Sequence, residues 1–179
     1  MNVLRTLVVV SSLSAFALSG CGGGGQEVRV QSSPPAEAAQ HAKTYALGST
    51  EQAPPRYRSS PKSQEAARHI GPMLEAALKM KGYEPAKSVA DADLVWMYAA
   101  GRREVQKAPT MTNRESGDSL SEPTEEFEEG AVIIDALDKN GVQAWHGFGR
   151  AEIDPKNVDD AVLRKTVDQI MARFPNAAK

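Results

Sequence analysis

The decisive stretch of the sequence is AVIIDALDKNGVQAWHGFGRAEI, residues 131–153. It opens with a run of small, branched and apolar residues, which is typical of a β-strand. Asn140-Gly141 follows, a pair that favours a type I′ turn, and the residues from Val142 onward predict the returning strand. The stretch therefore predicts a β-hairpin, and this hairpin is the clearest supersecondary signal in the chain.

Three further strands are predicted upstream of the hairpin, at residues 27–31, 43–47 and 93–99. The last of these has large apolar side chains on both of its faces, so both faces are expected to be covered. Residues 102–129 are predicted to form a polar acidic loop, because 115–129 contain seven acidic side chains and no basic one. A cation-binding loop is the alternative, but the ordered oxygen-ligand spacing of a calcium loop is missing.

Two helices complete the pattern. The first is predicted to begin at Ser63 and to end at Gly82, with a kink or a later start caused by Pro72. The second is predicted to be capped by Asn157 and closed by Pro175. Together the elements predict an α+β domain with a mostly antiparallel sheet of about four to five strands and two helices packed on one face.

The beginning of the chain is predicted to be a lipoprotein signal peptide. Residues 1–20 have a basic start and an apolar run that is too short to span a bilayer. The segment Leu18-Ser19-Gly20-Cys21 resembles the lipobox of bacterial lipoproteins. This resemblance implies that Cys21 receives a diacylglycerol thioether, that the signal is cut before it, and that the new amino terminus is acylated. The alternative is an ordinary buried cysteine near a transmembrane helix.

The lipobox sets the expected domain boundaries. Residues 1–20 are the signal peptide, 21–26 the lipidated cysteine and a Gly-rich tether, 27–175 a single α+β domain, and 176–179 a tail. Two or three acyl chains make a durable membrane anchor. Gly22, and not an aspartate that would resemble an inner-membrane retention signal, follows the cysteine. In a Gram-negative envelope, the sequence thus favours an outer-membrane anchor with the domain facing the periplasm.

Several short motifs of the domain occur in a specific order. They are Lys43-Thr44-Tyr45, Lys81-Gly82-Tyr83, Ala92-Asp93-Leu94-Val95, the glycine-led strand 130–135, Trp145-x-Gly147 and Phe174-Pro175. Over nearly all of residues 27–175, this order resembles the bacterial lipoproteins grouped as domain of unknown function 4136. The chain departs from the pattern at Pro72 and in its long acidic loop. That family is functionally uncharacterised, so the resemblance implies a location and a fold but no catalytic residues.

Composition and motifs argue against several classes of function. The chain has 179 residues, with 21 Lys plus Arg and 23 Asp plus Glu, and this balance argues against a nucleic-acid binder. Neither a Gly-x-Ser-x-Gly elbow nor a Gly-x-x-x-x-Gly-Lys phosphate loop occurs. One cysteine and three scattered histidines form no metal motif. We expect no cofactor, no metal and no enzymatic activity.

The hairpin holds the remaining candidate residues. Counting outward from its turn places Asp135 opposite His146, and Ala136 opposite Trp145. A carboxylate beside an imidazole can act as an acid/base pair, or it can simply fix the register of two strands. Trp145 is expected to pack in the core, with an exposed recognition role as the alternative.

The lipobox, the predicted fold and the hairpin residues leave three candidate functions. The first is a lipid-anchored domain, held in the membrane by the acyl chains on Cys21, that acts through contacts with an envelope protein. The alternatives are a carrier of a small molecule or lipid, and a hydrolase that uses Asp135 and His146 with a nearby serine or threonine. The sequence leaves the oligomeric state open.

Overall fold

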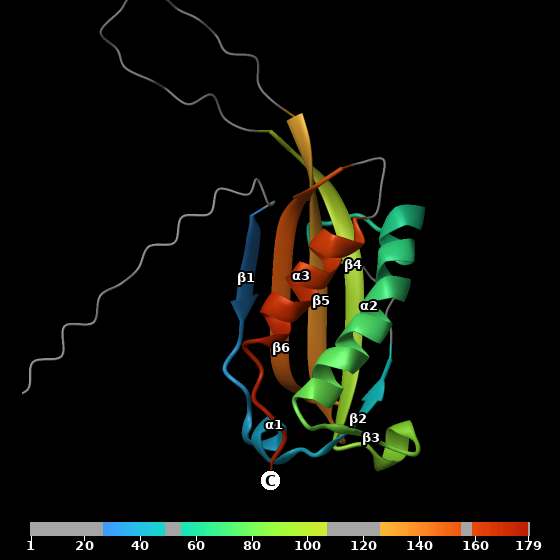
Figure 1. The fold of residues 1–179 in the computed structure, drawn as a ribbon, viewed down its shortest axis with the longest axis vertical. Helices are drawn as coiled ribbons and strands as arrows, with labels where there is room; N and C mark the ends of the chain where they lie inside the picture. The colour runs from blue at the N-terminus through green and yellow to red at the C-terminus, as the bar shows by residue number, and fades with distance from the viewer. Residues whose placement is uncertain (1–26, 49–54, 107–125, 155–158, 179) are drawn as a thin grey trace, which may run out of the picture.

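The computed structural model describes residues 27–48, 55–106, 126–154 and 159–178 (Figure 1). The predicted signal peptide, the lipobox and Cys21 lie outside these residues, as does the expected helix cap Asn157. None of the helices within the described ranges has the length and apolar character needed to cross a membrane.

A six-stranded sheet forms one layer of the domain, with strand order β1-β6-β5-β4-β2-β3. The strands are β1 (Val28–Ser32), β2 (Thr44–Leu47), β3 (Glu84–Pro85), β4 (Leu94–Gln106), β5 (Glu126–Asp138) and β6 (Gln143–Ile153). β1, β6, β5 and β4 pair in antiparallel fashion, whereas β2 pairs in parallel with both β4 and β3. The prediction of a mostly antiparallel sheet is confirmed, and the two-residue strand β3 is an addition to it.

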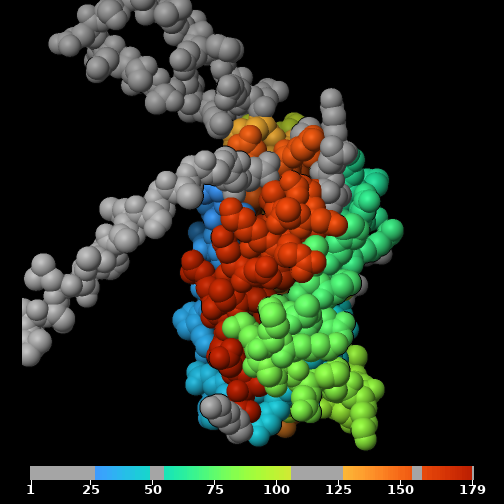
Figure 2. Space-filling model, in the orientation of Figure 1, coloured from blue at the N-terminus to red at the C-terminus, as the bar shows by residue number. Residues whose placement is uncertain are grey.

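The helices form the second layer. They are α1 (Glu37–His41), α2 (Pro61–Met80) and α3 (Asp160–Met171), with a short 3-10 helix, η1 (Val89–Asp91), before β4. α2 and α3 lie on one face of the sheet (Figure 1) and contact each other there (Figure 2). The predicted packing of two long helices on a single face is therefore confirmed, and α1 is an extra turn near the lower end of the sheet.

The helix starts differ from the predicted ones. Ser60, and not Ser63, caps α2, and the two serines bond reciprocally in a capping box ahead of the first turn. Pro61 occupies the first turn of α2, where a proline is favoured, and the helix continues through Pro72 without a late start. α3 is capped by the carboxylate of Asp159.

The hairpin has the predicted register but a different turn. Asp135 pairs with His146 as expected. At the turn, the Gly141 N–H donates to the carbonyl of Asp138, and only Gly141 among the turn residues has a positive φ, of 76°. A type I′ turn needs positive φ at both central residues, so this is a three-residue loop that ends in a left-handed glycine. The predicted type I′ turn is wrong.

β4 and β5 are each 13 residues long, so the predicted acidic loop at 102–129 is wrong at both ends. Residues 102–106 continue β4, and residues 126–129 begin β5. Two cross-strand ion pairs stabilise this extension, Arg102–Glu128 and Arg103–Glu129, with 3.2 and 2.9 Å between nitrogen and oxygen. Two adjacent arginines of β4 thus pair with two adjacent glutamates of β5.

The core lies between the sheet and the helices. Its centre is an aromatic cluster in which the Phe174 ring packs 4.7 Å from Trp96 and 5.1 Å from Trp145, measured between ring centroids. Phe174 follows α3 directly, so the cluster lies beneath the C-terminal ends of the two long helices. Gly147 allows α3 to approach the sheet, because a Cβ atom there would lie 2.4 Å from Ile170.

Candidate functional site

Asp135 and His146 lie on the sheet face opposite to α2 and α3. Side chains alternate along a strand, and the buried neighbours Ile134 and Trp145 point towards the helices. On the other face, the Oδ1 atom of Asp135 lies 2.7 Å from Nδ1 of His146. The same oxygen accepts a hydrogen bond of 2.7 Å from Nε2 of Gln143. The structure therefore brings the predicted pair together and adds a third residue to it.

Trp145 is not part of this surface. Its side chain is 1% exposed and packs in the aromatic cluster, so the alternative of an exposed recognition residue is wrong. The physical reason is the two-residue period of the strand, which turns Trp145 inward and His146 outward.

A hydrolase needs a nucleophile at the second ring nitrogen of the histidine. The Ser33 hydroxyl bonds to His146, but its Oγ atom accepts from the backbone N–H, at 2.9 Å, and not from the ring. Among the described residues, no hydroxyl or thiol bonds the other ring nitrogen of His146. The arrangement therefore suits a cross-strand pair that fixes register.

Apolar side chains surround the Asp135–His146 pair on the same face. Cross-strand register places Met97, Asp135 and His146 in one row, and Ile133 and Phe148 in a neighbouring row. Five large apolar side chains of this face near the pair are half-buried, although no long helix covers them; they are Val95, Met97, Ile133, Leu137 and Phe148. We call these five residues the apolar row. The expectation that both faces of the strand at 93–99 are covered by packed elements is thus met only in part.

Tyr57 lies at the end of the apolar row that is nearest to Arg103 and Glu129. Its ring packs 6.0 Å from the Phe148 ring, and the Arg103 guanidinium lies 5.0 Å from its centroid. Its hydroxyl donates to Glu129 at 2.5 Å, and Glu129 also pairs with Arg103 and Arg150. Burial, together with the hydrogen bond to Glu129, raises the pKa of Tyr57 to about 12. Tyr57 therefore stays protonated and holds the segment before α2 against the sheet.

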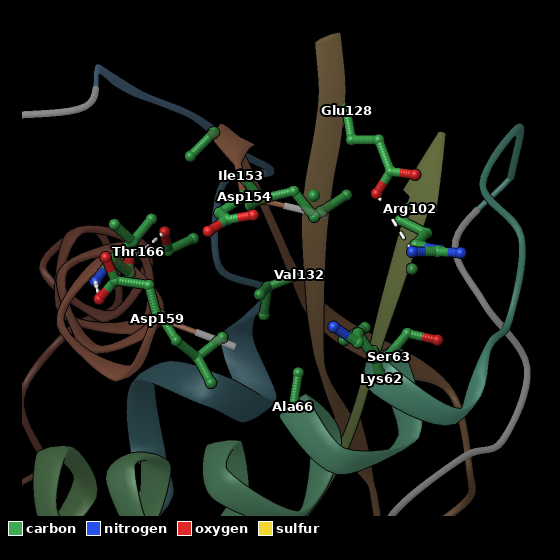
Figure 3. A pocket seen from close by; sticks show the side chains of 17 residues that line it. Lys62, Ser63, Ala66, Arg102, Glu128, Val132, Ile153, Asp154, Asp159 and Thr166 are labelled. Atoms are coloured by element: carbon green, nitrogen blue, oxygen red, sulfur yellow. Dashed lines mark hydrogen bonds and ion pairs between the residues drawn. The ribbon is translucent and has the colours of Figure 1, made fainter. Parts of the chain in front are cut away.

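A cavity of about 80 Å³ lies on the helix side of the sheet, between the N-terminal halves of α2 and α3 (Figure 3). Ala66 of α2, Val132 of β5 and Leu163 of α3 line it. Its floor consists of small residues from the central strands, which are Ala100, Gly101, Gly130, Ala131 and Ala151. Because small side chains cannot fill the space below two helices, the cavity follows from this composition.

A polar cleft of about 240 Å³ adjoins the cavity. Its lining residues are Arg58, Ser59, Ser60, Arg102, Arg103, Glu104 and Glu128. The cavity and the cleft share Arg102 and Glu128, the ion pair drawn in Figure 3. The carrier alternative expects a cleft between the sheet and its helices, but sequence reasoning predicted none of the lining residues, because the signal is a series of small residues in strands that are far apart along the chain.

Within the described ranges, no three histidine, cysteine or acidic side chains are grouped as a metal site would require. Neither the cavity nor the cleft is lined by Asp135 or His146. The candidate sites are therefore two separate surfaces, the apolar row on one face of the sheet and the groove of cavity and cleft on the other.

Comparisons with known proteins give a family and a fold. The family model described as "Domain of unknown function (DUF4136)" matches residues 30–176. The PelC dodecamer from Paraburkholderia phytofirmans has a similar fold, with a TM-score of 0.51 and 14% identity over 86% of this chain and 100% of that one. A DUF4136 family protein from Bacteroides thetaiotaomicron gives a TM-score of 0.46 and 17% identity over 84% and 98% of the two chains. No curated protein matches.

Proposed function

The chain belongs to the DUF4136 family of domains of unknown function, and from this premise we propose that it is an outer-membrane lipoprotein whose domain faces the periplasm and contacts an envelope protein. The lipobox at Leu18 to Cys21 and the glycines after it support the anchor. Acyl chains on Cys21 would then hold the domain at the membrane through a tether of a few residues.

The apolar row is the observation that carries the binding role. An antiparallel sheet with one solvated face normally alternates apolar inward and polar outward residues. Here Met97, Ile133 and Phe148 lie on the face away from the helices, which breaks that alternation. A contiguous apolar patch that no element of the described structure covers supports a contact with another protein. Envelope protein binding through this face is therefore the function that the geometry supports best.

The partner to test first is a second copy of this chain. The structurally similar PelC is a dodecamer, which makes self-association a concrete form of the proposed contact. Chemical crosslinking of native envelopes that contain the full chain, followed by co-purification and mass spectrometry, separates a second copy from a different protein.

Two matched variants sharpen this experiment. Ile133→Arg places a charge in the apolar row, whereas Val142→Arg places the same charge at an exposed position of the hairpin turn, where the valine is 62% exposed. We expect Ile133→Arg to abolish the crosslinked species and Val142→Arg to leave it unchanged. If the wild-type chain gives no crosslinked partner, or if both variants retain it, the proposed contact is wrong.

A carrier is the second candidate, and the cavity is the observation that favours it. At about 80 Å³ the cavity alone is smaller than the ~300–1,000 Å³ of ordinary ligand pockets. The adjoining cleft of about 240 Å³ brings the groove to the lower end of that range.

A further inference from the structure

We propose that the groove of cavity and cleft binds an anionic amphiphile with a single alkyl chain. The groove lies at the end of the domain where α2 and α3 begin and where β5 starts and β6 ends (Figure 1). The proposal goes beyond the protein contact described above and rests on the carrier alternative, because it names the class of ligand that this groove takes.

The apolar part of the ligand is indicated by uneven filling between the two layers. Beneath the C-terminal ends of α2 and α3, the space is filled by the three rings of Trp96, Trp145 and Phe174. Beneath their N-terminal halves, Ala100, Gly130 and Ala151 take the place of large side chains and leave the cavity. Its volume of about 80 Å³ is below the ~150 Å³ of an engineered cavity that admits benzene, so it suits only the terminal part of one alkyl chain.

The polar part of the ligand is indicated by the cleft. Arg102 and Glu128 line both hollows, so an occupant that extends from one to the other passes from apolar to charged surroundings within a few side chains. An amphiphile with its tail in the cavity and its head group in the cleft matches this change of lining. Two acyl chains would not fit the cavity.

The charge of the head group follows from the arginines. Three arginines and two glutamates line the cleft, and Lys62, Asp154 and Asp159 are further charged residues of the cavity lining, so the charge of the head group depends on the arginine that a ligand can engage most easily. Arg58 pairs with Glu104 at 3.3 Å, but the two side chains are 71% and 74% exposed, and an exposed pair of this kind contributes little. Arg58 can therefore exchange Glu104 for a ligand at small cost, and a guanidinium matches phosphate or carboxylate oxygens in a bidentate geometry. Ser59 and Ser60 add hydroxyl groups beside it.

The start of β1 lies beside the cavity, a short distance along the chain from the proposed lipid anchor. Val28, the first residue of β1, pairs with Ala151, which lines the cavity. Six residues separate Cys21 from Val28, and such a segment spans at most about 25 Å when fully extended. This step rests on the proposed lipid anchor, whereas the groove itself does not. A single-chain amphiphile from the membrane surface is thus within reach.

Photoaffinity labelling in native envelopes tests the proposal with the full chain. The probe is decyl phosphate that carries a diazirine at the end of its alkyl chain, and the labelled peptides are identified by mass spectrometry. Decyl maltoside with the same diazirine controls for the head group, and inorganic phosphate is added as a competitor. We expect the phosphate probe to label peptides that contain Ala66, Val132 or Leu163, and we expect the maltoside probe to label them much less.

Matched variants locate the site. Ala66→Leu fills the cavity, and Ala76→Leu makes the same change at an exposed position of α2. Arg58→Gln removes the head-group contact, and Arg68→Gln makes the same change on the exposed surface of α2. We expect the first variant of each pair to reduce labelling about tenfold, which corresponds to ~1.4 kcal/mol, and the second to leave it unchanged. Arg58 is exposed, so its variant tests the site even where Ala66→Leu does not fold.

Several outcomes would overturn the proposal. Labelling spread evenly over the chain, or unaffected by Ala66→Leu and Arg58→Gln, would show that the groove is not the site. Equal labelling by decyl maltoside would refute the anionic head group, and displacement by inorganic phosphate alone would refute the amphiphile. Groove labelling in a chain found without acyl groups would support this proposal and contradict the lipid anchor, so the two failures are distinguishable.

Discussion

Asp135 and His146 face each other across the β5–β6 hairpin, with 2.7 Å between Oδ1 of the aspartate and Nδ1 of the imidazole. The contact lies on the sheet face without the long helices, and Gln143 donates to the same carboxylate oxygen. No hydroxyl or thiol among the described residues completes a catalytic arrangement at the other ring nitrogen. The pair therefore contributes to strand register, and its contribution can be measured.

His146→Gln should lower the free energy of unfolding by less than about 1 kcal/mol, because a cross-strand pair contributes only that much. Urea denaturation of the wild-type and variant chains gives the difference. The variant should also complement a deletion strain. A His146→Gln protein that folds normally but fails to complement would promote the histidine to a functional residue.

Gly141→Val should destabilise the protein by about 1–3 kcal/mol, since a β-branched residue resists the left-handed backbone that this turn requires. Gly141 has a φ of 76°, and no atom lies within 4 Å of a Cβ placed there, so backbone strain is the only cost. Gly141→Asn is the matched control, because asparagine tolerates this region. Equal urea midpoints for the two variants would contradict this description of the turn.

Phe174→Ala should cost about 3–5 kcal/mol, the usual loss for a large aromatic side chain in a core. The Phe174 side chain is 2% exposed and its ring contacts those of Trp96 and Trp145. Phe148→Ala removes the same ring from the half-buried apolar row and should cost clearly less. Thermal melts of both variants make the comparison, and a reversed order would mean that the core is misassigned.

Asp93→Asn should remove part of the pH dependence of stability. The Asp93 carboxylate accepts from the backbone N–H groups of Lys43 and Thr44, both at 2.9 Å, and from the Thr44 hydroxyl at 3.0 Å. These bonds, led by that from Lys43, lower the pKa of Asp93 in the folded protein. The stabilisation is therefore fully present above the ordinary aspartate pKa of about 3.9 and is lost as the pH falls through the lower folded value.

Melting temperatures measured from pH 7 down to pH 3 test this expectation. The wild-type chain should melt at a higher temperature than Asp93→Asn at pH 7, and the gap should narrow below about pH 4. A gap that is constant over the whole range would show that the carboxylate charge is not involved.

The hairpin was predictable because its strand and turn signals all lie within residues 131–153. The turn signal at Asn140-Gly141 predicted a two-residue loop, and counting outward from it placed Asp135 opposite His146. The actual loop is one residue longer, and the register shift between Ala136 and Leu137 restores this pairing. The type of turn was not predicted correctly, because Asn140-Gly141 fits both a two-residue and a three-residue loop. The hydrogen bonds of Asp138 with Gly141 and Val142 give the three-residue loop.

Long-range pairing explains most of what the sequence missed. Most residues of 102–106 and 126–129 are charged, and their extended conformation depends on pairing with the other strand, which local propensity does not predict. The parallel pairing of β2 with β3 and β4 joins segments separated by a helix. The groove depends on small residues from three strands that meet only in the folded sheet.

We propose that Cys21 becomes the lipid-bearing amino terminus of an envelope protein. The intact mass of the chain purified from envelopes is the measurement that decides this. We expect a mature chain that lacks residues 1–20 and carries the added mass of a diacylglycerol thioether and an acyl group. We also expect the Cys21→Ser variant to accumulate as the uncleaved, unmodified precursor. A wild-type chain that retains residues 1–20 without acyl mass, or a Cys21→Ser chain that matures and fractionates like the wild type, would contradict the proposal.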